Sequence, residues 1–299
     1  MSKMGQRSVN RSNYTLNVIK YALLELVAAI LIILWLVPLY AMILGGLKSN
    51  LEAASTSILL PPNKPSLEAY AFAWFGYATI PGLEPTMLRY LIVVIPSVLL
   101  STVLGTMTAY FFFILSEKHN ILSNTLFSIL ALATFLPIET VTFPLIEMET
   151  SLNLYDTYQG LIFALLIFYV PTSALLMSIF IPVVPKYLLE SARIDGAGDW
   201  TILWRVVFPL IFPGFLSTLI FVFLQVWNQF FIPLILTNTP NMLMLPVAAR
   251  FYTAAYALIY NRSFAAGVIS SLIPLVIFIF LGRYFIRGLA ALGGGAKGV

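Results

Sequence analysis

Long apolar runs, separated by short polar segments, dominate the pattern of this chain. Six of the runs hold about 20 residues or more, the length that an α-helix needs to cross a hydrocarbon core of about 30 Å. The pattern therefore predicts six transmembrane helices, over residues 21–44, 90–115, 122–146, 160–181, 210–236 and 264–286. The polar segment 182–209, between the fourth and fifth runs, is the most informative connection.

Composition supports the same fold class. The chain is 60% hydrophobic and only 9% charged, whereas soluble domains carry roughly 25% charged residues. Such a chain cannot cover a surface that faces water, so it must face lipid. We expect an all-α polytopic membrane protein, with residues 1–299 forming one transmembrane domain.

The distribution of basic residues predicts the orientation in the cell membrane. Eleven Lys and Arg residues fall in the two tails and in the second and fourth connections, against five on the other side. Basic connections stay in the cytoplasm. We therefore expect both termini and the segment 182–209 to be cytoplasmic.

The sequence offers no catalytic or metal-binding set. His119 is the only histidine and cysteine is absent, so no nucleophile–base pair or metal cluster can be assembled. The glycines near the C-terminus lack the spacing of a phosphate-binding loop. We expect no enzyme activity, no metal and no cofactor in this chain. Its net charge of +4 is also too small and dispersed to indicate nucleic-acid binding.

Polar side chains inside the predicted spans are candidates for a solute path, because such groups are costly in lipid. Glu139 lies in the third span, and Gln225, Asn228 and Gln229 lie beside Trp227 in the fifth. Spacings of three and four place the three amides on one helical face. An aromatic ring next to amides suits a sugar. The alternatives are hydrogen bonds that join helices and, for Glu139, a hydrated helix end.

The segment 182–209 is predicted to fold as a short polar helix. Pro185 can begin a helix, and residues 186–194 contain no helix breaker. Gly196 suits the left-handed backbone conformation in which many helices end. Asp199 can cap a second short helix, after which Pro209 enters the fifth span. We expect a rigid helical segment that a partner protein can bind, rather than a catalytic site.

The residues of this segment also carry a family resemblance. They read Glu190-Ser191-Ala192-Arg193-Ile194-Asp195-Gly196-Ala197, with Pro209 following. This string closely resembles the E-A-A-x-x-D-G-A…I-x-L-P loop of binding-protein-dependent ABC importer permeases. The block 226–230, with its Trp-Asn pair, and the end of the chain, 283–298, are similar to the carbohydrate branch of the maltose type. Two departures are Ser191, where the family has Ala, and Gln229, where it has an acid.

The resemblance implies a type I ABC importer permease fold and a subunit of an ATP-driven sugar importer. The implied partners are a second permease, ATP-binding cassette subunits that bind ATP and Mg, and an extracellular or periplasmic sugar-binding protein. Glu190, Ser191, Ala192, Asp195, Gly196, Ala197 and Pro209 would then form the ATPase-coupling loop. Overall similarity points further to an archaeal glucose importer. The alternatives are a secondary transporter of a small polar solute and an ABC permease for a substrate other than a sugar.

Overall fold

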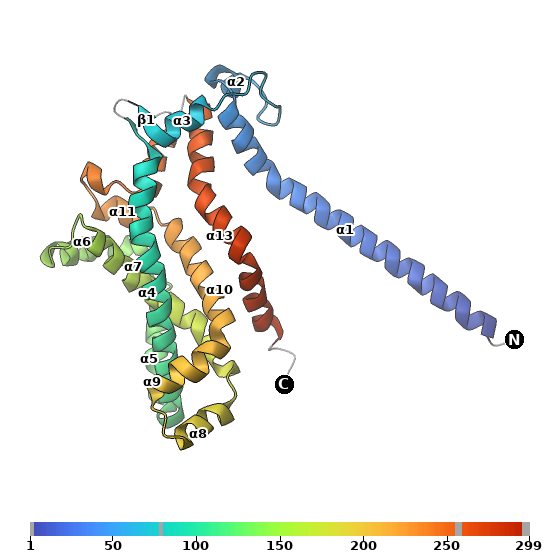
Figure 1. Cartoon of the computed structure of the whole chain (residues 1–299), viewed down its shortest axis with the longest axis vertical. Coiled ribbons are helices and arrows are strands. Elements are labelled where there is room, and N and C mark those ends of the chain that lie inside the picture. The colour runs from blue at the N-terminus through green and yellow to red at the C-terminus, as the bar shows by residue number, and fades with distance from the viewer. Residues whose placement is uncertain (1–2, 78–79, 255–258, 295–299) are drawn as a thin grey trace. The chain divides into compact units, whose positions relative to one another are not determined.

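The computed structural model describes residues 3–77, 80–254 and 259–294, and these are largely helical (Figure 1). The long helices are α1 (Lys3–Leu47), α4 (Leu83–Lys118), α7 (Tyr158–Phe180), α10 (Phe208–Trp227) and α13 (Tyr260–Gly294). The shorter helices are α2 (Asn50–Ser55), α3 (Glu68–Phe75), α5 (Asn120–Ala133), α6 (Thr142–Ser151), α8 (Lys186–Ile194), α9 (Asp199–Ile202), α11 (Phe231–Leu236) and α12 (Leu245–Ala254).

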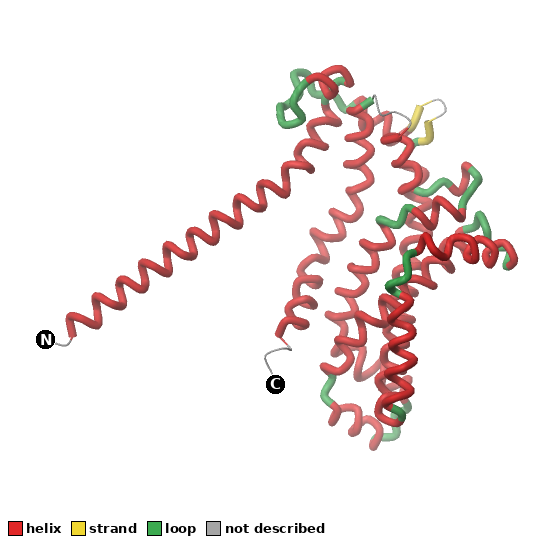
Figure 2. The backbone as a smooth tube through the Cα atoms, turned by 180° about the vertical axis from the view of Figure 1, so that it is seen from behind, coloured by secondary structure: helices red, strands yellow, loops and turns green. Residues whose placement is uncertain are grey.

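Single helical turns and one hairpin complete the described chain. The turns are the 3₁₀ segments η1 (Ile138–Val141), η2 (Ile181–Val183) and η4 (Pro240–Met242), and the π-helical segment η3 (Leu203–Val207). Strands β1 (Gly76–Tyr77) and β2 (Ile80–Pro81) pair antiparallel, with Gly76 opposite Pro81. They form the yellow segment in Figure 2.

The chain divides into two compact units. The first comprises Met1–Ala73 and Tyr256–Val268, and the second comprises Trp74–Ala255 and Ile269–Val299. In the first unit, Gly45 packs directly against the ring of Phe264 and Gly46 against that of Tyr70, because a Cβ at either glycine would overlap the ring. The Lys48 side chain is buried here, and its Nζ donates to Thr56 Oγ1 at 3.0 Å and to the Ser57 carbonyl at 2.7 Å.

In the second unit, α4, α7 and α10 form the core of the helix bundle (Figure 1). α4 and α7 approach each other closely at Gly105, where an added Cβ would lie 2.3 Å from the Cβ of Ser173. The stripe of small residues Ser97, Ser101, Gly105 and Ala109 on α4 is buried along this seam. Small residues allow close helix packing in lipid, where the hydrophobic effect does not drive helix association.

Membrane-spanning potential agrees with the predicted topology. Within the described residues, five helices are long and apolar enough to cross a membrane, and α5 with η1–α6 forms a sixth candidate that is bent by 92°. α5 ends at Ala133, whereas the predicted span continues to residue 146. The chain bends at the Leu136-Pro137 step, since a residue before proline avoids helical geometry. The fifth span also ends earlier than predicted, at Trp227. Because of the bend between α5 and η1–α6, α6 lies transverse to α4 and projects from the side of the bundle (Figure 1).

Candidate functional site

The segment 182–209 folds into two short helices that lie at one end of the second unit (Figure 1). Pro185 is the N-cap of α8, and the helix ends in a Schellman motif. The Gly196 amide donates to the Arg193 carbonyl at 3.0 Å, and the Ala197 amide donates to the Ala192 carbonyl at 2.9 Å. Gly196 has φ +82°, the left-handed conformation that glycine adopts without strain. The stop predicted at Gly196 is therefore present. Asp199, predicted as a cap, is instead the first residue of α9, which Gly198 caps.

α8 has one buried and one exposed face. Leu189 is 2% exposed and packs, with Ala192 and Ala197, against a cluster that includes Ile202 and Val207. The other face carries the exposed residues Glu190, Ser191, Ile194, Asp195 and Gly196. Ile194 is 86% exposed and Trp200, on α9, is 64% exposed. Large apolar side chains gathered on a polar exposed face are typical of a docking surface.

The docking surface connects to the spans without a flexible linker. Arg193 pairs with Glu117 near the end of α4, at 3.1 Å. From α9 the chain runs through η3 directly into α10, where Pro209 lies in the first turn. A cavity of ≈ 340 Å³ between α4 and α9 is lined by Tyr110, Lys118, Asp199 and Trp200, among others. α8 is therefore joined to α4 by an ion pair and to α10 by the continuous chain through α9 and η3.

The candidate solute path centres on a break after α10. The helix stops at Trp227 and α11 begins at Phe231. The Tyr90 hydroxyl, about two turns into α4, donates to the carbonyls of Val226 and of Gln229, the latter at 3.2 Å. The Tyr169 hydroxyl donates to the Gln225 carbonyl at 3.4 Å. The carbonyls of Gln225 and Gln229, which the break leaves without helical donors, thereby gain partners, whereas the Val226 carbonyl also accepts from the Gln229 amide at 3.0 Å.

Because α10 ends at Trp227, the residues that were predicted to share one polar helical face lie in different environments. Gln225 and Asn228 are exposed, whereas Trp227 is 5% exposed. The Gln229 side chain turns back: its Oε1 accepts from the Phe231 amide at 3.0 Å, and its Nε2 donates to the Tyr169 hydroxyl at 3.4 Å. Gln229 therefore supports the break. Glu139 is exposed on η1, and the structure does not bring it together with the α10 residues.

Sequence reasoning missed the residues that surround this break. Beside Trp227 and Asn228 lies a cavity of ≈ 260 Å³, whose other walls are Leu245 and Pro246 of α12 and Ser270, Ser271 and Pro274 of α13. Trp227 Nε1 donates to the Ser270 carbonyl at 3.1 Å. The sequence signals that could have pointed toward this wall are the polar pair Ser270 and Ser271 and the helix breaker Pro274, all inside the sixth predicted span.

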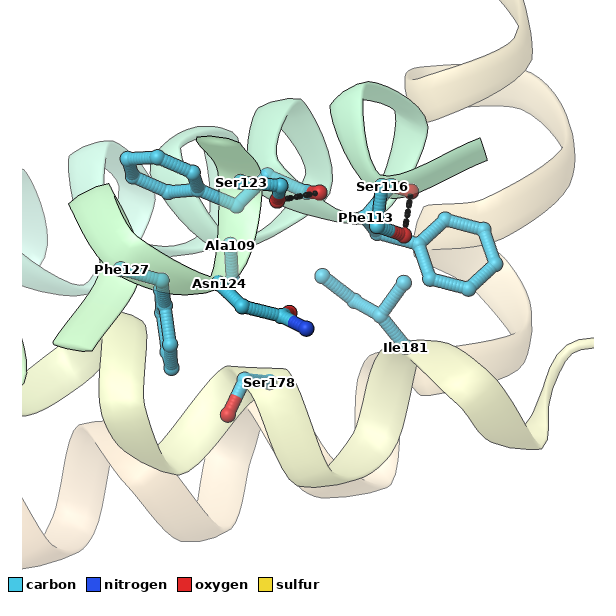
Figure 3. Close-up of a pocket in the computed structure, with 9 residues that line it drawn as sticks. Ala109, Phe113, Ser116, Ser123, Asn124, Phe127, Ser178 and Ile181 are labelled. Atoms are coloured by element: carbon cyan, nitrogen blue, oxygen red, sulfur yellow. Dashed lines mark hydrogen bonds between the residues drawn. The ribbon is translucent and has the colours of Figure 1, made fainter. Parts of the chain in front are cut away.

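A smaller cavity of ≈ 140 Å³ lies between α4, α5 and the end of α7 (Figure 3). The Asn124 side chain points into it, and its Nδ2 donates to Asn120 Oδ1 at 2.9 Å. The hydroxyls of Ser116, Ser123 and Ser178 bond to backbone carbonyls. With its hydroxyls already bonded and a volume well below the roughly 300 Å³ at which ligand pockets begin, this cavity is a poor candidate for a solute.

At the end of the bundle opposite α8, the α6–α7 connection carries two unusual carboxyls. Glu149 on α6 is fully buried, and neither of its oxygens has a hydrogen-bond partner in the described chain. Burial also acts on Asp156, but hydrogen bonds from the Asn238 and Thr239 amides, at 2.9 and 3.3 Å, outweigh it and lower the pKa of Asp156. Asp156 thereby ties this connection to the one that follows α11.

The described chain is a bundle of apolar helices long enough to cross a membrane, with a helix that breaks after Trp227 and an exposed polar segment at one end, an architecture suited to a membrane permease. The chain belongs to the family of binding-protein-dependent transport system inner membrane components, which it matches over residues 101–290. This confirms the resemblance found in the sequence.

Relatives agree with this assignment. The chain is 51% identical to the glucose import system permease protein GlcU of Saccharolobus solfataricus, over 94% of this chain and 98% of the relative. It is 28% identical to the arabinooligosaccharides transport system permease protein AraQ of Bacillus subtilis, over 92% and 95%. A crystal structure of a bacterial ABC transporter that imports alginate has the same fold, with a TM-score of 0.73 at 19% identity, covering 92% of this chain and 98% of that one.

Proposed function

We propose that this chain is the permease subunit of an ATP-driven sugar importer, with glucose as the first candidate substrate. In this role it pairs with a second permease, receives sugar from an extracellular or periplasmic binding protein, and docks two ATP-binding cassette subunits through α8. ATP and Mg bind to those partners, and this chain holds no cofactor. Both termini and α8 face the cytoplasm.

The exposed face of α8 is the observation that carries the proposal. The inner face of α8 is anchored by the buried Leu189. Its outer face presents Glu190, Ile194 and Asp195 to solvent, where a partner protein can bind them. Its sharp stop at Gly196 and its continuity with α10 suit transmission of movement. A secondary transporter would need coupling groups at mid-membrane and would leave this surface without a use.

Glucose is supported by the identity to the glucose permease over nearly the whole length of both chains. The solute path is proposed to pass Gln225, Trp227 and Asn228 at the end of α10. Glu139, exposed at the bend after α5, contributes at the path's rim.

Reconstitution tests the proposal. The chain is assembled with its permease partner, ATPase subunits and binding protein in proteoliposomes, and uptake of labelled glucose, an arabinooligosaccharide and an amino acid is compared. We expect glucose uptake that requires both ATP and the binding protein. Uptake driven by an ion gradient without ATP would overturn the importer assignment, and preference for another solute would overturn glucose.

Reversing a charge on α8 tests coupling, and reversing a charge outside α8 is the matched control. Glu190→Lys changes an exposed side chain and should leave the bundle folded, but like charges at an interface cost several kcal/mol. We expect lost ATPase stimulation with normal membrane insertion. Lys64→Glu, an exposed reversal in the first unit that lies outside α8, should leave stimulation unchanged.

A further inference from the structure

The cavity beside the break after α10 has the properties of a binding site within this chain. A helix that stops inside a membrane bundle exposes polar backbone, and this is tolerated where protein or a watery cavity satisfies it. Here the Tyr90 hydroxyl donates hydrogen bonds to the carbonyls on one side of the break. The opposite side opens into the ≈ 260 Å³ cavity between Asn228, α12 and α13.

Asn228 presents an accessible amide oxygen at this cavity. Its Nδ2 donates to the Leu224 carbonyl at 2.8 Å, which fixes the orientation of the amide. In the part of the chain that the structure describes, Oδ1 accepts no hydrogen bond, and the residue is exposed. A fixed amide oxygen in a polar cavity is suited to accept from a hydroxyl.

Trp227 positions Asn228 rather than stacking on a solute. The indole is 5% exposed, its Nε1 donates to the Ser270 carbonyl at 3.1 Å, and its ring packs 5.6 Å from Tyr90 and from Phe223. So little of the ring is accessible that a sugar face cannot lie on it. The indole instead forms a rigid wall that links the end of α10 to α13.

The cavity volume limits the occupant. The cavity has a volume of ≈ 260 Å³ and is open on one side. That is room for one sugar ring, and it lies just below the usual range for pockets that bury larger ligands. An oligosaccharide could enter only with most of its length outside.

We propose that this cavity is a monosaccharide subsite of this chain, in which Asn228 Oδ1 accepts a hydrogen bond from a sugar hydroxyl during passage. The proposal rests on the proposed import function, and it adds that this permease itself contacts the sugar. In this proposal, the cavity walls contributed by α12 and α13 select for a single sugar ring.

Cysteine protection tests the subsite, because the native chain contains no cysteine. Ser271→Cys places a thiol in the cavity wall, and Asn238→Cys places one on the exposed connection after α11, outside it. Alkylation of each is measured in the complete complex, with partner subunits free of reactive cysteines, in D-glucose or maltose. At about ten times the dissociation constant, glucose should slow alkylation of Ser271→Cys roughly tenfold by mass action. Maltose should protect much less, and Asn238→Cys should be unaffected.

A second variant isolates the acceptor. Asn228→Leu, combined with Ser271→Cys, keeps the side-chain size and removes Oδ1, so glucose protection should disappear while the complex still assembles. Protection that survives Asn228→Leu, or that is equal at Ser271→Cys and Asn238→Cys, would overturn the subsite.

The two proposals fail in different ways. ATP-driven glucose uptake without protection at Ser271→Cys would refute the subsite and leave the import function standing. Protection at Ser271→Cys without ATP-driven uptake would support sugar binding by the cavity and refute the importer assignment.

Discussion

Replacing Gly196 by alanine should weaken coupling through backbone strain alone. Gly196 has φ +82°, and nothing lies within 4 Å of an added Cβ, so alanine meets no clash within the chain. The left-handed conformation costs an L-residue about 1–2 kcal/mol. Because the bonds to Ala192 and Arg193 depend on this conformation, the cost falls on the last turn of α8. A change of that size shifts a local equilibrium by roughly 5–30-fold.

The assay is sugar-stimulated ATP hydrolysis by the purified complex, with subunit stoichiometry measured in parallel. Gly196→Ala should lower stimulation several-fold, and Gly196→Asn should lower it less, because asparagine tolerates positive φ. Gly198→Ala is the matched control, since Gly198 also has nothing within 4 Å but has φ −74°. Equal effects of Gly196→Ala and Gly198→Ala would show that the strain argument is wrong.

Three further predictions concern other parts of the chain. Glu149 is fully buried, and neither of its oxygens has a hydrogen-bond partner in the described chain. Because burying a carboxyl without a partner is costly and burying its charged form costs most, Glu149→Gln should raise the thermal midpoint at neutral pH, whereas Glu147→Gln, at an exposed position on the same helix, should not; equal effects of the two substitutions would contradict the reasoning. Lys48→Met removes the donor of two part-buried hydrogen bonds, to Thr56 and Ser57, and should cost about 1 kcal/mol, measured as faster hydrogen exchange over residues 45–66; unchanged exchange would refute it. For topology, Asn238→Cys should react with an impermeant maleimide from outside the cell and Ile194→Cys only from inside; the reverse pattern would invert the proposed orientation.

The sequence predicted those features that depend on neighbouring residues. Gly196 follows a run without helix breakers, so a left-handed stop could be expected there, and its φ agrees. The long spans follow from apolar runs that have no other stable arrangement in lipid. The family follows from the string around Glu190, which the match over residues 101–290 supports.

Features that depend on distant partners could not be predicted. The end of α10 at Trp227 depends on Tyr90 and Tyr169, which supply hydrogen bonds from other helices. Helical periodicity placed Gln229 on the face of Asn228, but Gln229 instead bonds to Phe231 beyond the break. Glu149 is buried because the connection between α6 and α7 is tight. A Cβ added at Gly160 would lie only 2.6 Å from Glu149 Oε2, so the two helices approach closely at this point.

The two faces of α8 separate folding from recognition. Its underside is aliphatic and fixed by packing around Leu189, while the outward side chains touch little of their own chain. Substitutions on the outward face can therefore accumulate without loss of the fold. With α8 as the proposed docking site, the specificity for an ATPase subunit could then change independently of the membrane bundle. Chimeras that exchange only these outward side chains should allow one permease to be driven by the ATPase of another.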